Sequence, residues 1–155
     1  ALATRLSLKF RDLDDEIVAE ENRSIPSIFA TDGEIYFRRK EAKVLKDLLE
    51  KEEDYVLALG GGTPCYGKNL QLIKDAPNVI LIYLKTSLQQ LIERLSKEKD
   101  SRPLIKELET PDVLEDFIRK HLFERTFYYN QSDVVISTDD KMLQQIVEEI
   151  TGKLN

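Results

Sequence analysis

The sequence has very few of the residues that build metal centres and disulfide frameworks. It contains one cysteine, one histidine and no tryptophan. The single cysteine, Cys65, excludes an internal disulfide, and without a cluster of cysteine and histidine a zinc site is not expected. We therefore expect a protein of the reducing cytoplasm.

Long apolar runs and an excess of basic charge are missing as well. The longest apolar run, residues 79–84, is far too short to span a bilayer, and the N-terminal segment ALATRLSLKF carries no secretory signal. Lysine and arginine number 23 against 29 acidic residues, a net charge of −6. We expect no nucleic acid and no membrane as a partner, although an acidic protein can hold a small anion in a local basic pocket.

Strands and helices alternate along what remains. The length of 155 residues fits one domain, residues 1–155, and 41% of the residues are apolar. Apolar patterns predict four short strands, at 9–12, 55–59, 79–84 and 133–137. The second and third of these are expected to be buried. Helices are expected at 1–8, 14–21, from Ser24 to about 52, 67–74, 87–96, 111–128 and 141–154. This alternation predicts an α/β fold with a parallel sheet covered on both faces.

The stretch LALGGGT, residues 57–63, ends one of these strands in three successive glycines. Glycine weakens a strand, so such a run indicates that something approaches the backbone closely. Ligands of open α/β sheets bind at the carboxyl ends of the strands, where these glycines would lie. A flexible strand-to-helix turn is the alternative interpretation.

Five charged residues could carry chemistry, and each has a plainer interpretation. Asp12 and Asp14 follow a strand, where they could serve a metal-bound water and a substrate hydroxyl, or only favour a helix N-terminus. Arg38 could clamp an anion, or form a surface pair with a glutamate three residues on. Arg102 could act from a closing lid or simply be exposed, and Arg125 could do no more than favour a helix C-terminus.

Taken in order, these segments resemble the shikimate kinases. The series is DLD at 12–14, FATDGE at 29–34, FRR at 37–39 with Glu41, GGG at 60–62, RPL at 102–104, and Arg125 with Tyr129. The resemblance covers essentially the whole chain, and the ordered set is specific where GGG or RPL alone would not be. It implies a three-layer sandwich around five parallel strands in the order 2-3-1-4-5, with a substrate-binding region at about 12–45 and a mobile lid at about 97–110.

Shikimate kinases transfer the γ-phosphoryl group of ATP to the 3-hydroxyl of shikimate, a step of chorismate and aromatic amino-acid biosynthesis. By resemblance, Asp14 binds the shikimate hydroxyls and is placed to accept the proton of the attacking oxygen. Asp12 is placed toward the water shell of Mg²⁺, the implied cofactor. The implied partners are the small molecules shikimate and ATP, and a monomer is expected.

The resemblance also gives the arginines and glycines their roles. Arg38 and Arg125 would pair with the shikimate carboxylate, whereas Arg102 would be catalytic and bind the ATP phosphates. Arg94 is a weaker candidate for a contact with adenine. A backbone N–H of the glycine run would touch the substrate, and a side chain would collide with it, which implies substrate-binding roles for Gly60, Gly61 and Gly62.

The family's phosphate-binding motif, G-x-x-x-x-G-K-[ST], is absent from the sequence. The nearest pair, Gly67-Lys68, follows no matching first glycine and precedes Asn69. In the family this loop follows the first strand and feeds a helix whose later turns resemble residues 1–8. We therefore expect the loop and the first, central strand to lie upstream of Ala1, leaving a gap in the sheet and no productive ATP binding by the chain as it stands.

Two other functions stay open at this point. One is another small-molecule kinase of the same fold, such as a gluconate-type kinase, which a substrate panel would distinguish. The other is a shikimate-binding module without the phosphate-binding loop and without kinase activity.

Overall fold

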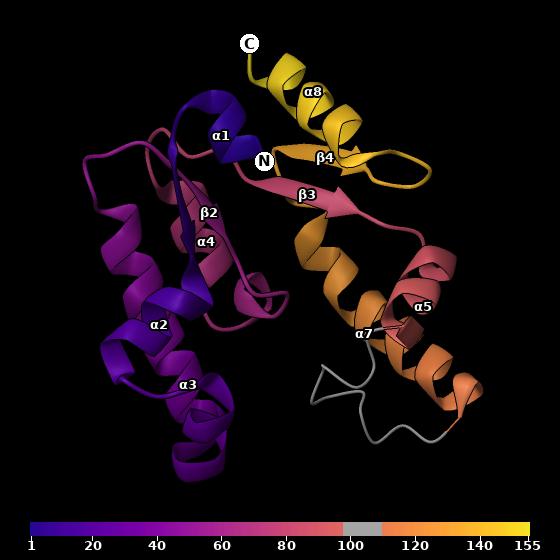
Figure 1. Ribbon diagram of the computed structural model, residues 1–155. Helices are drawn as coiled ribbons and strands as arrows, with labels where there is room; N and C mark the ends of the chain where they lie inside the picture. The colour runs from indigo at the N-terminus through magenta and orange to yellow at the C-terminus, as the bar shows by residue number, and fades with distance from the viewer. Residues whose placement is uncertain (98–109) are drawn as a thin grey trace. The chain divides into compact units, whose positions relative to one another are not determined.

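The computed structural model of the chain describes residues 1–97 and 110–155 (Figure 1). The described strands are β1 (Lys9–Asp12), β2 (Tyr55–Ala58), β3 (Ile82–Lys85) and β4 (Val134–Ser137). The described helices are α1 (Leu2–Leu6), α2 (Leu13–Glu21), α3 (Ile25–Leu49), η1 (Thr63–Cys65), α4 (Asn69–Asp75), α5 (Leu88–Lys97), α7 (Pro111–Tyr129) and α8 (Leu143–Leu154). Of the lid expected at about 97–110, only the two end residues are described, and Arg102 lies outside the described residues.

The described strands form two separate parallel pairs, β1 with β2 and β3 with β4. These are the pairs that the order 2-3-1-4-5 leaves when its first strand is removed. The predicted α/β class with parallel pairing is therefore confirmed. The chain divides correspondingly into two compact units, Ala1–Leu81 with Thr151–Asn155, and Ile82–Ile150.

The core of the first unit is formed by the β1–β2 pair and helices α2, α3 and α4. Apolar side chains of α3 recur at helical spacing, so they form one buried face. The buried cluster consists of Leu13, Ile17, Ile28, Phe37, Val44, Leu45, Leu48 and Ile73. Ser24 caps α3 through its hydroxyl and proline follows in the first turn, as the sequence predicts.

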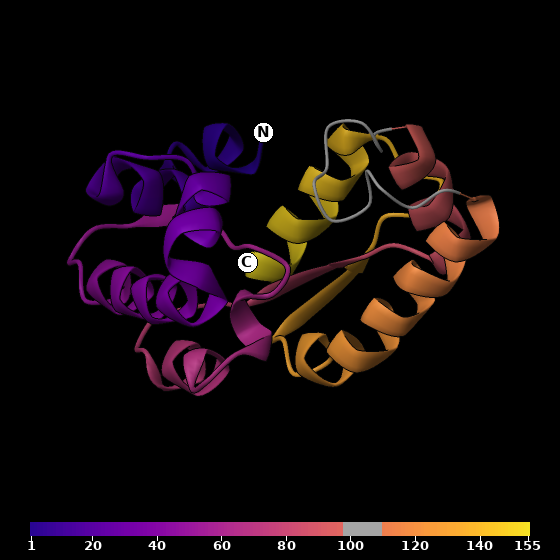
Figure 2. The ribbon, with the colours of Figure 1, turned by 90° about the horizontal axis from the view of Figure 1, so that it is seen from below.

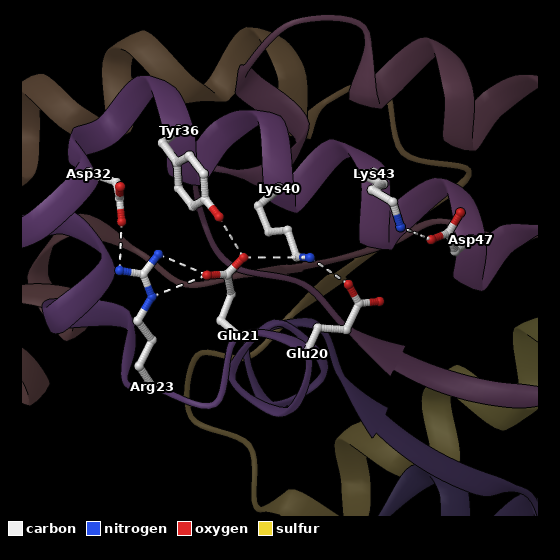
Figure 3. Close-up of polar contacts among 8 residues, drawn as sticks. All are labelled: Glu20, Glu21, Arg23, Asp32, Tyr36, Lys40, Lys43 and Asp47. Carbon is white, nitrogen blue, oxygen red and sulfur yellow. Dashed lines mark hydrogen bonds and ion pairs between the residues drawn. The ribbon is translucent and has the colours of Figure 1, made fainter.

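Helix α3 is interrupted at Gly33, whose φ of 81° and ψ of 178° are not helical. This backbone conformation is open essentially to glycine alone. Ion pairs and hydrogen bonds tie both sides of the break to the end of α2 (Figure 3). Arg23 bonds Glu21 and Asp32 before the break, while Tyr36 and Lys40 beyond it contact Glu21. The substrate-binding region expected at about 12–45 is thus one braced pair of helices.

The second unit is built around the β3–β4 pair and the α5–α7 helix pair. Figures 1 and 2 show α7 and α8 on opposite sides of the two strands, so helices cover both faces. Thr110 caps α7 as the sequence predicts. The apolar contacts between α5 and α7 centre on Leu114 and Ile118.

One expectation about a strand is wrong. The apolar run 79–84 predicts a buried strand, but β3 covers Ile82–Lys85 and the side chains of Ile80 and Leu84 are 53% and 51% exposed. The physical reason is that β3 has a single strand neighbour, β4, in the part of the chain that is described. Among the described helices, none is long and apolar enough to cross a membrane.

Candidate functional site

The candidate site lies in the first unit, at the carboxyl ends of β1 and β2. Asp12, the last residue of β1, is in register with Ala58, the last residue of β2. The acids that follow β1 and the glycines that follow β2 therefore emerge at the same edge of the sheet. The sequence places these two segments far apart, and parallel pairing brings them together.

Asp12 ends the strand and caps the next helix. Its Oδ1 accepts a hydrogen bond from the backbone N–H of Asp14 at 2.9 Å. The plainer interpretation of this acid, a helix N-terminus, is therefore correct. Within residues 1–97 and 110–155, no group of three or more histidine, cysteine, aspartate or glutamate side chains is arranged to hold a metal ion.

Asp14 is the half-buried acid of the site. Burial raises the pKa of its carboxyl above the ordinary value, and the neighbouring carboxylates of Asp12 and Glu41 raise it further. Arg38 opposes this effect and lowers the pKa. A carboxylate with a raised pKa is a better proton acceptor, which is the property a general base needs.

Arg38 projects from α3 and pairs with a buried acid one turn on. Its Nη1 donates to Glu41 Oε1 at 2.9 Å, and the Glu41 side chain is only 1% exposed. The pair anticipated from the spacing exists, but it is not on the surface, since the Arg38 side chain is 19% exposed. A buried carboxylate needs its partners, so Glu41 holds the guanidinium in place.

The aromatic ring of Tyr66 fixes the plane of the same guanidinium. The Arg38 Cζ lies 3.9 Å from the centre of the Tyr66 ring, a close cation–π contact. The Arg38 Nε lies 3.6 Å from Glu34 Oε1, which is too far for a hydrogen bond. A cavity of about 460 Å³ opens beside Arg38 and Tyr66, with Lys68 in its wall.

The glycines leave room for the side chains of the site. A Cβ at Gly62 would lie 2.8 Å from Arg38 Nη2, and one at Gly60 would lie 3.2 Å from Thr63 Oγ1 and 3.7 Å from Asp14 Oδ1. Both distances of closest approach are shorter than ordinary contacts, so a side chain at either position would displace the guanidinium or the hydroxyl from the place it occupies. Side chains of the chain itself therefore approach Gly60 and Gly62 closely, in addition to the ligand contact expected there.

The remaining sequence-predicted arginines belong to the second unit or lie outside the described residues. Arg125 is half-buried on α7 in the second unit, on the helix whose Tyr129 ring packs 5.0 Å from that of Tyr83. Arg94 donates to Gln90 on α5 at 3.0 Å. Arg102 lies outside the described residues.

Two side chains of the site, Thr63 and Tyr66, were missed by sequence reasoning. Both follow the glycine run within a few residues, and neither has a pattern of its own in the sequence. Their only available signal was proximity to the glycines.

Comparison with known proteins decides the family. A family model described as shikimate kinase matches residues 1–155. The chain belongs to the shikimate kinase family. Family members are ATP-dependent phosphotransferases, so the enzyme class predicted from the ordered motifs is confirmed.

Curated shikimate kinases from two flavobacteria are similar over most of their length. The one from Flavobacterium psychrophilum is 45% identical over 150 residues, which is 96% of this chain and 86% of the relative. The one from Flavobacterium johnsoniae is 40% identical over 143 residues, covering 92% of this chain and 82% of the relative.

Solved shikimate kinases share the fold. The structure from Acinetobacter baumannii, in complex with shikimate, superposes with a TM-score of 0.84 at 30% identity, covering 99% of this chain and 82% of that one. The structure from Bacteroides thetaiotaomicron gives a TM-score of 0.83 at 26% identity, with 99% and 85% covered. The three-layer α/β architecture expected from the shikimate kinase resemblance is thereby confirmed.

Proposed function

We propose that this chain binds shikimate at the edge of the β1–β2 pair and acts there in the family's reaction, transfer of the ATP γ-phosphoryl group to the 3-hydroxyl of shikimate. The observation that carries the proposal is the convergence of Asp14, Arg38 and the glycine run. One carboxylate, one guanidinium and a bare backbone suit a small ligand that bears hydroxyls and a carboxylate. Residues 1–155 belong to a single shikimate kinase domain in this proposal.

Arg38 is the primary anchor of the shikimate carboxylate in this proposal. Its guanidinium is held by Glu41 and Tyr66, so it is fixed before the ligand arrives. Arginine pairs with carboxylates through two parallel hydrogen bonds, and a fixed fork loses little entropy when it does so. Arg125 completes the clamp as a second cation.

Asp14 binds the shikimate hydroxyls and accepts the proton of the attacking 3-hydroxyl. Its raised pKa, caused mainly by burial, brings the carboxylate closer to the basicity that proton transfer needs. The substrate is also contacted by the backbone of the segment that follows β2, at Gly60, Gly61 and Gly62. Positioning of this kind is the main contribution that phosphoryl transfer requires from a protein.

Asp12 is the residue that would hold Mg²⁺, through a water molecule. One carboxylate is consistent with this ion, which keeps several waters and takes its other ligands from phosphates. When bound, Mg²⁺ neutralises charge on the phosphates. Arg102 is the residue proposed to contact the ATP phosphates. A cytoplasmic monomer is part of the same proposal.

Titration of the protein with shikimate tests the site directly. We expect one shikimate per chain by calorimetry, and at least tenfold weaker binding of the neutral methyl ester, because the ester loses charge-assisted hydrogen bonds to arginine. Equal binding of acid and ester would contradict the Arg38 anchor.

Turnover tests the reaction. Shikimate-dependent ADP release with ATP and Mg²⁺ supports the kinase, and gluconate should not replace shikimate. Shikimate binding without ADP release would instead favour a shikimate-binding module.

A further inference from the structure

The hydroxyl of Thr63 contacts the carboxylate of the Arg38–Glu41 ion pair. Thr63 is fully buried at 0% exposure, and its Oγ1 donates to Glu41 Oε2 at 3.0 Å. The other oxygen of the same carboxylate accepts from Arg38 Nη1 at 2.9 Å. One buried carboxylate therefore joins the hydroxyl to the guanidinium.

Two further bonds fix the position of that hydroxyl. The backbone N–H of Thr63 donates to the carbonyl of Gly60 at 3.0 Å. The carbonyl of Thr63 accepts from Asn69 Nδ2 at 2.9 Å, and Asn69 is 3% exposed at the start of α4. The backbone of Thr63 is thus hydrogen-bonded both to the glycine run and to the first residue of α4, and these bonds hold its hydroxyl in place.

The terminal torsion of a glutamate is soft, so a single partner leaves the carboxylate free to rotate. With Thr63 on one oxygen, the other oxygen points in one direction, and the guanidinium follows it. A fork that must meet a carboxylate with two hydrogen bonds depends on this direction.

We propose that Thr63 is a positioning residue for shikimate binding: through Glu41 it aims the Arg38 guanidinium, with Asn69 holding the Thr63 turn in place. The inference deepens the proposed function and rests on Arg38 as the carboxylate anchor. Thr63 itself acts without touching the substrate.

The test replaces Thr63 with valine, which keeps the shape and removes the hydroxyl. We expect Thr63→Val to raise the KM and Kd for shikimate about tenfold, the effect of one lost hydrogen bond to a charged group. The kcat and the KM for ATP should stay within about twofold of the parent values, since neither Thr63 nor Arg38 is proposed to bind nucleotide. Thr63→Ser restores the hydroxyl and should restore the KM, while Thr4→Val, at an exposed position on α1, serves as the control.

A double-mutant cycle distinguishes an effect of Thr63 on the orientation of Arg38 from a general effect on the stability of the protein. If Thr63 acts through Arg38, Thr63→Val should add nothing to the shikimate Kd in an Arg38→Ala background. An additive loss there, or a lowered Tm with an unchanged shikimate KM, would overturn the inference.

The same cycle distinguishes this inference from the proposed function. Unchanged shikimate binding in Arg38→Ala alone would contradict the proposed anchor. Lost binding in Arg38→Ala together with normal binding in Thr63→Val would overturn only the inference. Should Thr63→Val not fold, Asn69→Ala carries the test, with about threefold weaker shikimate binding expected from a loosened Thr63 turn and unchanged binding contradicting it.

Discussion

Arg38 and Glu41 lie one turn apart on α3, and their side chains form a 2.9 Å ion pair whose carboxylate is 1% exposed. Buried pairs of this kind contribute little net stability, but removing one partner leaves an uncompensated charge. The pair is therefore better understood as a fixed cation presented to a ligand than as a stabilising contact.

Replacing Arg38 with alanine should separate the two substrates. We expect shikimate binding to weaken about a hundredfold, because a bidentate charge-assisted pair is lost. Nucleotide binding should stay nearly intact, and Arg39→Ala, an exposed neighbour on the same helix, is the matched control. Equal loss of both substrates in Arg38→Ala would show that Arg38 is structural.

Replacing Gly62 with alanine should impair shikimate binding more than stability. The φ of Gly62 is −84°, which alanine adopts readily, so the main consequence is the 2.8 Å approach of the new Cβ to Arg38 Nη2. The end of the arginine can shift, so we expect a small change in Tm and about tenfold weaker shikimate binding.

Gly152→Ala on α8 is the control for this substitution, since nothing lies within 4 Å of its Cβ. It should be neutral or slightly stabilising because alanine favours helix. A large fall in Tm in Gly62→Ala with unchanged binding would count against the steric relationship.

Replacing Asp14 with asparagine should stabilise the protein while reducing turnover. The folded-state pKa of Asp14 is raised, so its contribution to stability is full below the unfolded pKa and is lost as the pH rises through the folded pKa. At neutral pH the charged carboxyl is a burden that asparagine removes, whereas turnover should fall at least a hundredfold without the base.

Thermal melts of both proteins against pH check this prediction. The gain in Tm for Asp14→Asn should be present at pH 7 and shrink in acid, where the native carboxyl is protonated. Asp15→Asn, at an exposed position, should show neither effect. A lower Tm for Asp14→Asn at pH 7 would mean that the carboxylate is stabilising.

The carboxylate of Glu53 should contribute to the stability of the fold in a way that depends on pH and on salt concentration. Hydrogen bonds from Lys9 and Arg11 lower the pKa of Glu53 from 4.5 to about 2. Its contribution is therefore present above pH 4.5 and is lost as the pH falls toward 2. Glu53→Gln should lower Tm at pH 7 and by less below pH 4, and high salt should narrow the difference. A difference that is independent of pH would contradict the pairing.

Replacing Gly33 with alanine should destabilise the α2–α3 pair. The φ of 81° and ψ of 178° are strained for any residue with a Cβ, and we expect a cost of about 1–3 kcal/mol. Chemical denaturation measures it. Gly152→Ala again provides the contrast, and equal stability of the two variants would argue against the break in α3.

Local sequence determined most of the secondary structure. The strand at Lys9–Asp12 and the caps Ser24 and Thr110 occur where periodicity and capping chemistry place them. These signals act over a few residues, so they are readable without the fold. The boundaries of the third strand were not readable, because its exposure depends on which strands pair with it.

The ordered motifs also determined the family, and with it the candidates Asp14 and Arg38. What only the tertiary structure decided is how those residues are held. The Thr63–Glu41 bond spans 22 positions of sequence, and Tyr66 reaches Arg38 from another segment. Such contacts exist because the buried face of α3 packs against β2, which brings Arg38 and Glu41 to the loop that follows this strand. No local pattern encodes that geometry.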